Sequence, residues 1–109
     1  MRFPTKSSLP AASKRLLEEM QRINFGRIEN LVVRDGLPVF TPAPRIVREM
    51  KFPGENGPRP ELNAPDFALK NQAREFFEQL AAIKNTVIEC LEIHHGIPFR
   101  MTFEEPTNS

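Results

Sequence analysis

The sequence contains no tryptophan and no tyrosine, and its only cysteine is Cys90. A single cysteine excludes an intrachain disulfide framework and a paired-cysteine metal site, so we expect a reduced, cytoplasmic setting. No stretch approaches the roughly 20 apolar residues of a membrane span, and the N-terminal residues lack the apolar core of a signal peptide. The missing tyrosine and tryptophan also weaken base-stacking schemes for nucleic-acid recognition.

Neither sign of charge dominates the chain. Its 15 lysines and arginines nearly balance its 14 aspartates and glutamates, which leaves a formal net charge of +1. Dedicated nucleic-acid-binding proteins usually carry a marked basic excess, so this balance disfavours a nucleic-acid partner. The length of 109 residues fits one domain with a substantial core.

The patterns that usually mark catalysis are missing as well. The short glycine-containing run at 54–57 does not join a strand to a helix, so it does not predict a phosphate-binding loop. Cys90 has no separately placed base, because His94 and His95 follow it on the same predicted strand. We therefore expect no enzymatic activity, no catalytic residue and no cofactor.

An internal repeat is the main feature that the sequence does contain. When the sequence is shifted by sixty positions, residues 16–40 align with residues 76–100 without a gap. Seven of the 25 aligned pairs are identical, whereas chance would give about two. We interpret this repeat as the duplication of a unit made of one helix and one hairpin.

Each unit is predicted to begin with a helix. In the first unit, apolar residues recur at helical spacing over residues 9–23, and Ser8 is the expected N-cap. In the second unit, Asn63 is the expected N-cap, Pro65 lies in the first turn, and the apolar stripe ends at Ile83. Polar residues occupy the opposite side of both stripes, so each helix should cover a core with one face.

A hairpin follows each predicted helix, with turns at 35–36 and 95–96. A two-residue type I′ turn would pair Val33 with Pro38, whereas a three-residue loop with a glycine bulge would pair Val33 with Leu37. We favour the bulged register because it separates apolar from polar side chains in the second hairpin, and it requires positive φ at both turn glycines. The expected apolar face holds Val87, Leu91, Ile93, Ile97, Phe99, Met101 and Phe103, and the other face holds Cys90, Glu92, His94, Pro98, Arg100 and Thr102.

Two such units predict an α+β fold in one domain that spans residues 1–109. The first α-β-β unit covers residues 8–41, a proline-rich connector covers 42–63, and the second unit covers 64–105. One unit is too small to be stable alone. Together, the units can form a four-stranded antiparallel sheet with both helices on its apolar face and a pseudo-twofold axis between the halves. A strand-swapped dimer of the same layers is the alternative.

The connector is the candidate contact surface, because no periodic pattern explains its apolar residues. Its five prolines exclude a long regular element, and residues 44–52 fit a short helix slightly better than a strand. Long loops in compact domains are often functional, and apolar side chains beside arginines are typical of interface centres. The simpler interpretation is a solvated loop, since glutamates interleave with the arginines. The candidate partner-binding residues are Arg45, Ile46, Arg48, Met50, Phe52 and Arg59.

A metal site on the second hairpin is disfavoured. Cys90, Glu92 and His94 recur at every second position, so their side chains would share one face of a strand. The equivalent positions of the first unit carry no such set, and three ligands from one strand would be unusual. We therefore expect no bound metal.

The run from Ile23 to Ile28, followed by the Asp-Gly pair at 35–36, resembles a family of very short bacterial proteins of unknown function. Their pattern is a helix, then Ile-x-Tyr/Phe-Gly, then a hairpin with Asp-Gly. The similarity covers about residues 16–40, and the second unit departs from it, with Asn85-Thr86 in place of Phe-Gly. The resemblance implies a bacterial cytoplasmic protein with a stable α-β-β unit, and it implies no activity.

These observations favour a non-enzymatic interaction module that binds a protein partner and self-associates, for example as a homodimer. The alternative is a nucleic-acid-binding regulator that uses the hairpin tips, at Arg34, His94 and His95, together with the connector arginines. The near-neutral charge weighs against this alternative.

Overall fold

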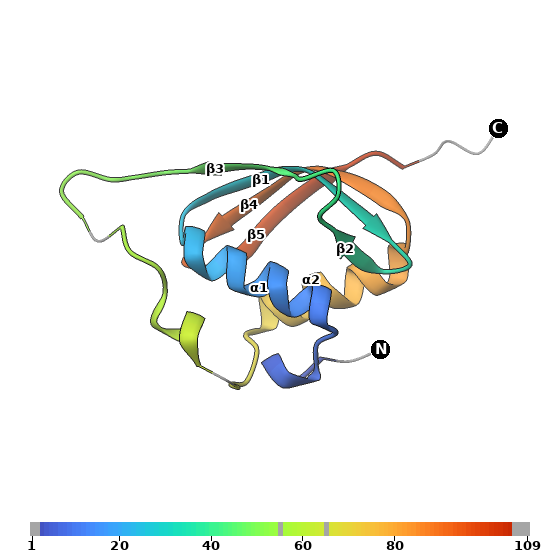
Figure 1. Cartoon of the computed structure of the whole chain (residues 1–109), viewed down its shortest axis with the longest axis horizontal. Coiled ribbons are helices and arrows are strands. Elements are labelled where there is room, and N and C mark those ends of the chain that lie inside the picture. The colour runs from blue at the N-terminus through green and yellow to red at the C-terminus, as the bar shows by residue number, and fades with distance from the viewer. Residues whose placement is uncertain (1–2, 55, 65, 106–109) are drawn as a thin grey trace.

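The computed structural model of the chain describes residues 3–54, 56–64 and 66–105, and the described residues form two layers (Figure 1). One layer is an antiparallel sheet, and two α-helices lie on one of its faces, so the expected α+β class is confirmed. Within the described ranges, neither helix is long and apolar enough to cross a membrane. The elements are η1 (Lys6–Ser8), α1 (Ala11–Ile23), β1 (Gly26–Arg34), β2 (Leu37–Val39), β3 (Arg45–Arg48), η2 (Pro60–Asn63), α2 (Asn71–Ile83), β4 (Thr86–His94) and β5 (Ile97–Phe103).

The sheet has five strands, one more than the sequence predicts. Strands β2, β1, β4 and β5 lie in that order. The additional strand is β3, which pairs with residues 26–29 of β1, whereas β2 pairs with residues 32–34. Because β4 occupies the other side of β1, β2 and β3 share one sheet edge. The prediction of a short helix over residues 44–52 is therefore wrong, because residues 45–48 form a strand that pairs with β1.

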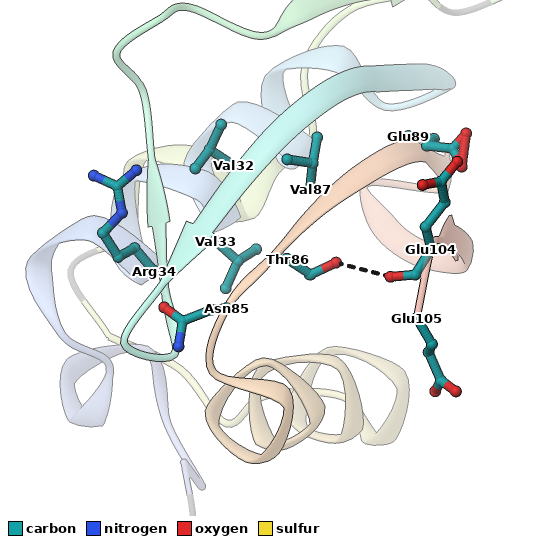
Figure 2. Close-up of a pocket in the computed structure, with 9 residues that line it drawn as sticks. All are labelled: Val32, Val33, Arg34, Asn85, Thr86, Val87, Glu89, Glu104 and Glu105. Carbon is teal, nitrogen blue, oxygen red and sulfur yellow. Dashed lines mark hydrogen bonds between the residues drawn. The ribbon is translucent and has the colours of Figure 1, made fainter. Parts of the chain in front are cut away.

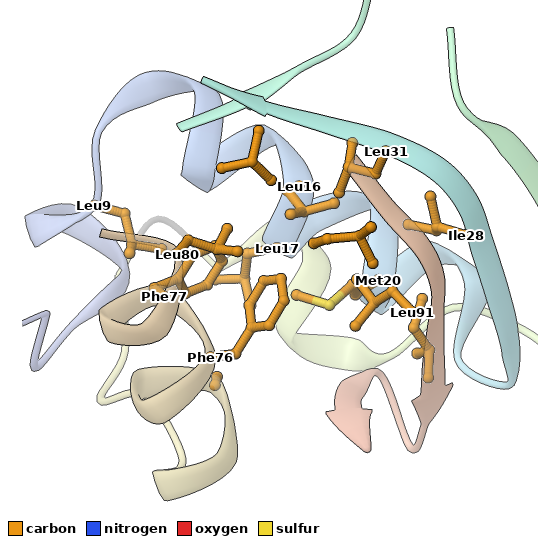
Figure 3. Close-up of a cluster of buried hydrophobic side chains, with 14 of the residues drawn as sticks. Leu9, Leu16, Leu17, Met20, Ile28, Leu31, Phe76, Phe77, Leu80 and Leu91 are labelled. Carbon is orange, nitrogen blue, oxygen red and sulfur yellow. The ribbon is translucent and has the colours of Figure 1, made fainter. Parts of the chain in front are cut away.

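The core lies between the two helices and the sheet (Figure 3). Apolar side chains from one face of each helix meet the alternate side chains of the central strands, as the predicted stripes require. Burying each such side chain stabilises the fold by about 1.5–3 kcal/mol. The most deeply buried side chains are Leu16, Leu17, Met20, Ile23, Ile28, Leu31, Val33, Phe77, Leu80, Ile88, Leu91 and Ile93.

Both hairpins close with two-residue turns, so the bulged register favoured from the sequence is wrong. Val33 pairs with Pro38 in the first hairpin, and Ile93 pairs with Pro98 in the second. In this register the prolines share the side of the sheet that faces the helices, and both are buried.

The turns nevertheless have the glycine conformation that the sequence predicts. Gly36 and Gly96 have φ of 79° and 73°, so the predicted positive φ is confirmed. The preceding residues, Asp35 and His95, also have positive φ, at 55° and 56°. Positive φ at both central residues is the requirement of a type I′ turn, whose twist matches that of the flanking strands.

The irregularities lie within the strands rather than at the turns. Asn30 has a φ of 59° in the middle of β1, and the pairing of β4 with β5 shifts near Glu89 and at Phe99. Each shift changes which side chains face the helices. As a result, Val87 and Phe99, which the sequence places in the core, are 46% and 59% exposed. Pro98, expected on the polar face, is buried instead.

Each hairpin turn contacts the helix of the other unit. The N–H of Gly36 donates to the carbonyl of Lys84 at 2.8 Å, and the N–H of Gly96 donates to the carbonyl of Asn24 at 2.9 Å. Asn24 and Lys84 are the C-caps of α1 and α2, so each turn bonds a carbonyl at the end of a helix, where intrahelical partners are lacking. The bounds of α2 and β4 are those of α1 and β1 plus sixty.

Both helices begin later than the sequence predicts. Helix α1 begins at Ala11 rather than directly after Ser8, and α2 begins at Asn71 rather than directly after Asn63. Pro65, expected in the first turn of the second helix, lies outside the described residues.

The segments that precede the two helices are fastened to each other, which explains these late starts. In residues 3–9, which we call the N-terminal strap, Lys6 is only 3% exposed and donates to the carbonyl of Ala64 at 2.9 Å. Ser7 donates from both its backbone N–H and its hydroxyl to the carboxylate of Asp66, each at 2.9 Å. Because these bonds fix both segments in place, neither segment extends its helix.

Candidate interaction surface

The sheet face opposite the helices is uncovered in the described part of the chain (Figure 1). Five large apolar side chains among the described residues are exposed, and three of them belong to the connector, namely Ile46, Met50 and Phe52. The other two are Val87 and Phe99 of the second hairpin. Clusters of exposed apolar side chains mark interaction sites more often than isolated ones do, so the connector and its surroundings are the part of the surface to consider first.

The three candidate residues of β3 have different neighbours. Arg45 forms an ion pair with Glu29 of β1 at 3.5 Å. Ile46 is 42% exposed and lines a small hollow beside α1. Arg48 donates to the carbonyl of Asn56. Arg48 therefore supports the loop that follows β3, and Arg45 belongs to the charged surface of the sheet.

After β3, the chain extends past the end of the sheet before it turns back (Figure 1). We call residues 50–54 and 56 the connector tip. Asn56 closes this loop, because its side chain accepts from the N–H of Lys51 and donates to the carbonyl of Lys51, both at 2.8 Å. On this closed loop Met50 is 52% exposed and Phe52 is 84% exposed. The tip thus holds two apolar side chains in solvent on a backbone that side-chain hydrogen bonds keep in shape.

The structure does not place Arg59 with the connector tip. Its side chain forms an ion pair with Glu61 at 3.3 Å, and its backbone N–H donates to the carbonyl of Gln21 in α1 at 2.9 Å. Its aliphatic part packs against the second hairpin turn, since a Cβ on Gly96 would lie 2.5 Å from the Cγ of Arg59. Of the six candidate residues, Arg59 is therefore the one that anchors the connector to the body of the protein.

A line of four rings lies at the end of the sheet from which the connector tip extends. The ring centroids of Phe25 and His95 are 4.7 Å apart in an edge-to-face arrangement. His94 lies 6.3 Å from Phe25 and stacks on Phe99 at 4.3 Å, with only 9° between the ring planes. We call these four residues the aromatic row. Such contacts hold the rings in fixed orientations, and each adds about 0.5–1.5 kcal/mol beyond area burial.

Cationic side chains lie over two rings of the aromatic row. The Nζ atom of Lys51 is 4.4 Å from the centroid of Phe25, and the guanidinium carbon of Arg100 is 5.8 Å from the centroid of Phe99. Lys51 belongs to the connector tip, so this cation–π contact joins the tip to the sheet. The tip and the aromatic row therefore form one continuous surface.

Sequence reasoning did not identify the aromatic row as a site. His94 and His95 were considered as hairpin-tip residues and His94 also as a metal ligand, whereas Phe99 was assigned to the core. The irregularity at Phe99 reverses its direction, and no sequence signal marks that irregularity. The one signal that drew attention to Phe25 is its place in the run from Ile23 to Ile28.

Paired charges occupy the centre of the uncovered sheet face. Arg27 donates to Glu29 at 2.8 Å, and Arg100 donates to Glu92. The hydrogen bond from Arg27 lowers the pKa of Glu29, and the hydrogen bond from Arg100 lowers the pKa of Glu92. Because each of these carboxylates has an arginine partner, this part of the face presents little net charge to a partner.

A shallow recess of about 700 Å³ lies at the opposite end of the β1–β4 pair (Figure 2). Val87 is part of its lining, Glu89 and Glu104 lie on one side, and Arg34 lies on the other. The hydroxyl of Thr86 donates to the backbone carbonyl of Glu104 at 3.4 Å, which ties the chain after β5 to this recess. The two hairpin turns therefore lie at opposite ends of the sheet, and Arg34 does not share a surface with His94 and His95.

The three residues weighed as metal ligands have other contacts. Cys90 is a free, half-buried thiol. Glu92 is paired with Arg100, and His94 stacks on Phe99. Among residues 3–54, 56–64 and 66–105, no group of three or more histidine, cysteine, aspartate or glutamate side chains has a geometry that could hold a metal ion.

No protein-family model matches the sequence, and searches of curated proteins and of solved structures found no significant match.

Proposed function

We propose that this protein is a non-enzymatic interaction module that binds a protein partner and self-associates, and that its contact surface is the connector tip together with the aromatic row. Met50 and Phe52 belong to this surface, and Arg48 supports the tip through its hydrogen bond to Asn56. Ile46 lies apart from the tip, in the hollow beside α1. Arg45 flanks it through its ion pair with Glu29.

The observation that carries the proposal is the exposure of Phe52. A phenylalanine that is 84% exposed on a loop closed by Asn56 gains nothing for the fold. Burying such a side chain against a partner would contribute about 1.5–3 kcal/mol. The closed loop also reduces the conformational entropy that binding would cost, because the backbone is already held in one shape.

The direct test replaces the exposed side chains without touching the support of the tip. We predict that Met50→Ser combined with Phe52→Ser weakens self-association or partner capture at least tenfold, because central apolar side chains dominate binding energy. Sedimentation over a range of concentrations measures self-association, and pull-down from lysate measures partner capture. Thermal melting should show an unchanged fold.

Val87→Ser is the matched control, because Val87 is also exposed but lies in the recess at the far end of the sheet. It should leave association unchanged. If the tip variant associates like the wild type, or if the Val87 control weakens association equally, the contact surface lies elsewhere.

Nucleic-acid binding is the second candidate, and the aromatic row is the observation that favours it. The ring of Phe99 is 59% exposed between His94 and Arg100, and stacking beside cations is how single strands are commonly bound. Under this alternative, Phe99→Ser would abolish binding of a labelled single-stranded oligonucleotide, and partners captured from lysate would be lost after nuclease treatment. Partners that survive nuclease support the protein-binding function.

We further propose that the two α-β-β units arose by duplication and are related by a pseudo-twofold axis. The equal bounds of the two helices and of β1 and β4 at an offset of sixty, and the reciprocal bonds from turn to helix end, support this relation. The C-caps also agree, with φ and ψ of 65° and −59° at Asn24 and of 73° and −60° at Lys84. Replacing residues 31–38 with the sequence of 91–98 should then give a cooperatively folding protein. An unfolded chimera would argue against the equivalence.

A further inference from the structure

The two edges of the sheet differ in how they are protected. One edge is divided between β2 and β3, which have three and four residues, and prolines at 38, 42 and 44 lie in or beside these strands. The other edge is β5, which has seven residues, and in the described part of the chain no strand pairs with its outer side. Short strands and prolines keep other chains from pairing with an edge, whereas a long unpaired edge is a template for a further strand. The β5 edge is therefore the one at which another strand can be added.

The side chains of β5 differ between its two faces. Met101 and Phe103 pair with buried residues of β4, so they lie on the side of the helices, where both are half-buried. Arg100 and Thr102 alternate with them and lie on the uncovered face, where both are exposed. A strand added to this edge therefore meets apolar side chains on one face and polar side chains on the other.

A second copy of β5 has the sequence that complements this edge. When two β5 strands run antiparallel with Thr102 opposite its own copy, Arg100 lies opposite Glu104 of the second copy, and Met101 lies opposite Phe103 of the second copy. Opposite charges and apolar pairs at such cross-strand positions stabilise a sheet. A register centred on Arg100 would set two arginines opposite each other, and one centred on Met101 would set Arg100 opposite Thr102. Of these three registers, the one centred on Thr102 gives the ion pair.

Arg100 and Glu104 are both able to form this additional ion pair. The contacts of Arg100 with Glu92 use its Nε and Nη2 atoms, so the donors of Nη1 remain for a second carboxylate. The Arg100 side chain is 68% exposed. Glu104 is also exposed, and no ion pair between described residues includes it. Charge complementarity therefore favours a second copy as the occupant of the β5 edge.

We propose that the protein forms a twofold-symmetric dimer in which two β5 strands pair antiparallel around Thr102. The two sheets then join into one, and the helices of both copies lie on the same side of it. A shallow hollow of about 200 Å³ lies between α2 and β5, with Phe76 and Met101 in its lining. Phe103 of the second copy is directed toward this hollow, because it lies opposite Met101 on the side of the helices.

This dimer rests on the self-association in the proposed function and gives it a geometry. Strand β5 also carries Phe99 of the aromatic row, so the dimer contact adjoins the proposed surface. The connector tip follows β3, which lies at the other edge of the sheet, and it remains accessible to the protein partner.

Charge variants test the ion pair across the axis. Sedimentation over a range of concentrations should show a dimer for the wild type, and Glu104→Lys should weaken it about tenfold or more, because it sets two cations opposite each other. Adding Arg100→Glu to that variant restores opposite charges and should restore the dimer. Glu105→Lys is the matched control, since it makes the same charge change one residue further on, and it should have little effect. A wild-type monomer at all concentrations, or equal losses in the two lysine variants, would overturn the proposal.

Cross-linking tests the register and requires no change of charge. In a Cys90→Ser background, Thr102→Cys places one thiol on the twofold axis, where the opposing Cα atoms are roughly 4.5–5.5 Å apart, within the range that a disulfide spans. Oxidation with copper phenanthroline at low protein concentration should give a covalent dimer. Thr41→Cys in the same background is the matched control, because Thr41 is exposed and follows β2 at the other edge. Equal cross-linking of the two variants, or none with Thr102→Cys, would overturn the proposal even if a charge variant fails to fold.

The tip variant, Met50→Ser combined with Phe52→Ser, separates this dimer from the proposed partner surface. It should lose partner capture and keep the dimer. Loss of the dimer in the tip variant would overturn the β5 contact and leave the proposed surface standing. An intact dimer together with full partner capture would overturn the proposed surface and support the β5 contact.

Discussion

Glycine occupies the second position of both hairpin turns, but the two glycines have different neighbours. A Cβ on Gly36 would lie 3.0 Å from the Cα of Ala81 in α2, whereas a Cβ on Gly96 would lie 2.5 Å from the Cγ of Arg59. The backbone of a packed helix cannot move aside, but a long, half-exposed side chain can. The first turn is therefore the less tolerant of the two.

We predict that Gly36→Ala lowers the free energy of unfolding more than Gly96→Ala does. Both substitutions carry the cost of a left-handed residue with a Cβ, about 1–2 kcal/mol, and only Gly36→Ala also forces α2 to shift. Urea denaturation measures the difference. Gly57→Ala is the control, since its Cβ would meet no atom within 4 Å, and it should change stability by less than about 0.5 kcal/mol. Equal losses at the two turns would contradict the prediction.

Among the elements, β3 depends on the lack of a side chain at Gly26. A Cβ on Gly26 would lie 2.2 Å from the carbonyl oxygen of Val47 and 3.0 Å from the Cα of Arg48. Sixty positions later, Thr86 begins β4, and no strand like β3 pairs with it among the described residues. Glycine at position 26 therefore allows the connector to join the sheet.

We predict that Gly26→Thr releases β3 from β1 and lowers the free energy of unfolding by about 1–3 kcal/mol. Hydrogen exchange should show faster exchange at residues 45–48, with unchanged protection in β4 and β5. Val47→Thr is a suitable control, because Val47 points away from the helices and its replacement leaves the contact with Gly26 intact. Protection at 45–48 that survives Gly26→Thr would contradict this role of the glycine.

The elements themselves were largely predictable from local pattern, but their pairing was not. Helical spacing of apolar residues identified both α-helices, and the Gly residues at 36 and 96 identified both turns. The predicted strand register was wrong because it assumed that side chains alternate strictly between the two faces along each strand, starting from the turn. Asn30 and Phe99 interrupt this alternation inside the strands. A strand was only the second choice for residues 44–52, because the four residues of β3 gain their structure from pairing with β1, which is distant in sequence.

At the scale of the whole molecule, the N-terminal strap joins the start of the chain to its middle. Two hydrogen bonds from Ser7 stabilise the ionised carboxylate of Asp66 and lower its pKa below the ordinary value of 3.8, with the backbone N–H as the largest cause. A carboxyl group with a lowered pKa in the folded state stabilises the fold above its unfolded pKa. This contribution is lost as the pH falls through the folded pKa.

We predict that Asp66→Asn lowers the free energy of unfolding at about pH 7. The difference in this free energy between the variant and the wild type should become smaller as the pH falls below about 4. Urea denaturation at several pH values measures this difference. Glu75→Gln removes one exposed carboxylate from α2 and serves as the control for net charge. A difference that stays constant between neutral and acid pH would show that the strap does not depend on the ionised form of Asp66.

The candidate surface was only partly predictable at this scale. The connector drew attention because no periodic pattern explained Met50 and Phe52, and both side chains are exposed. The aromatic row could not be predicted, because Phe25, His94 and Phe99 come from three strand ends that meet only after the β1–β4 pairing and the irregularity at Phe99 are in place.

The central pairing of β1 with β4 has a consequence for biosynthesis. It joins residues 26–33 to residues 86–93, so the ribosome completes the first unit before the partner strand exists. Until then, the inner edge of β1 and the carbonyls at the end of α1 lack their native partners, and an unpaired strand edge is a template for other chains. Two nascent chains on one messenger RNA would therefore expose the same edge at the same stage, and faster translation of the second half would shorten that exposure.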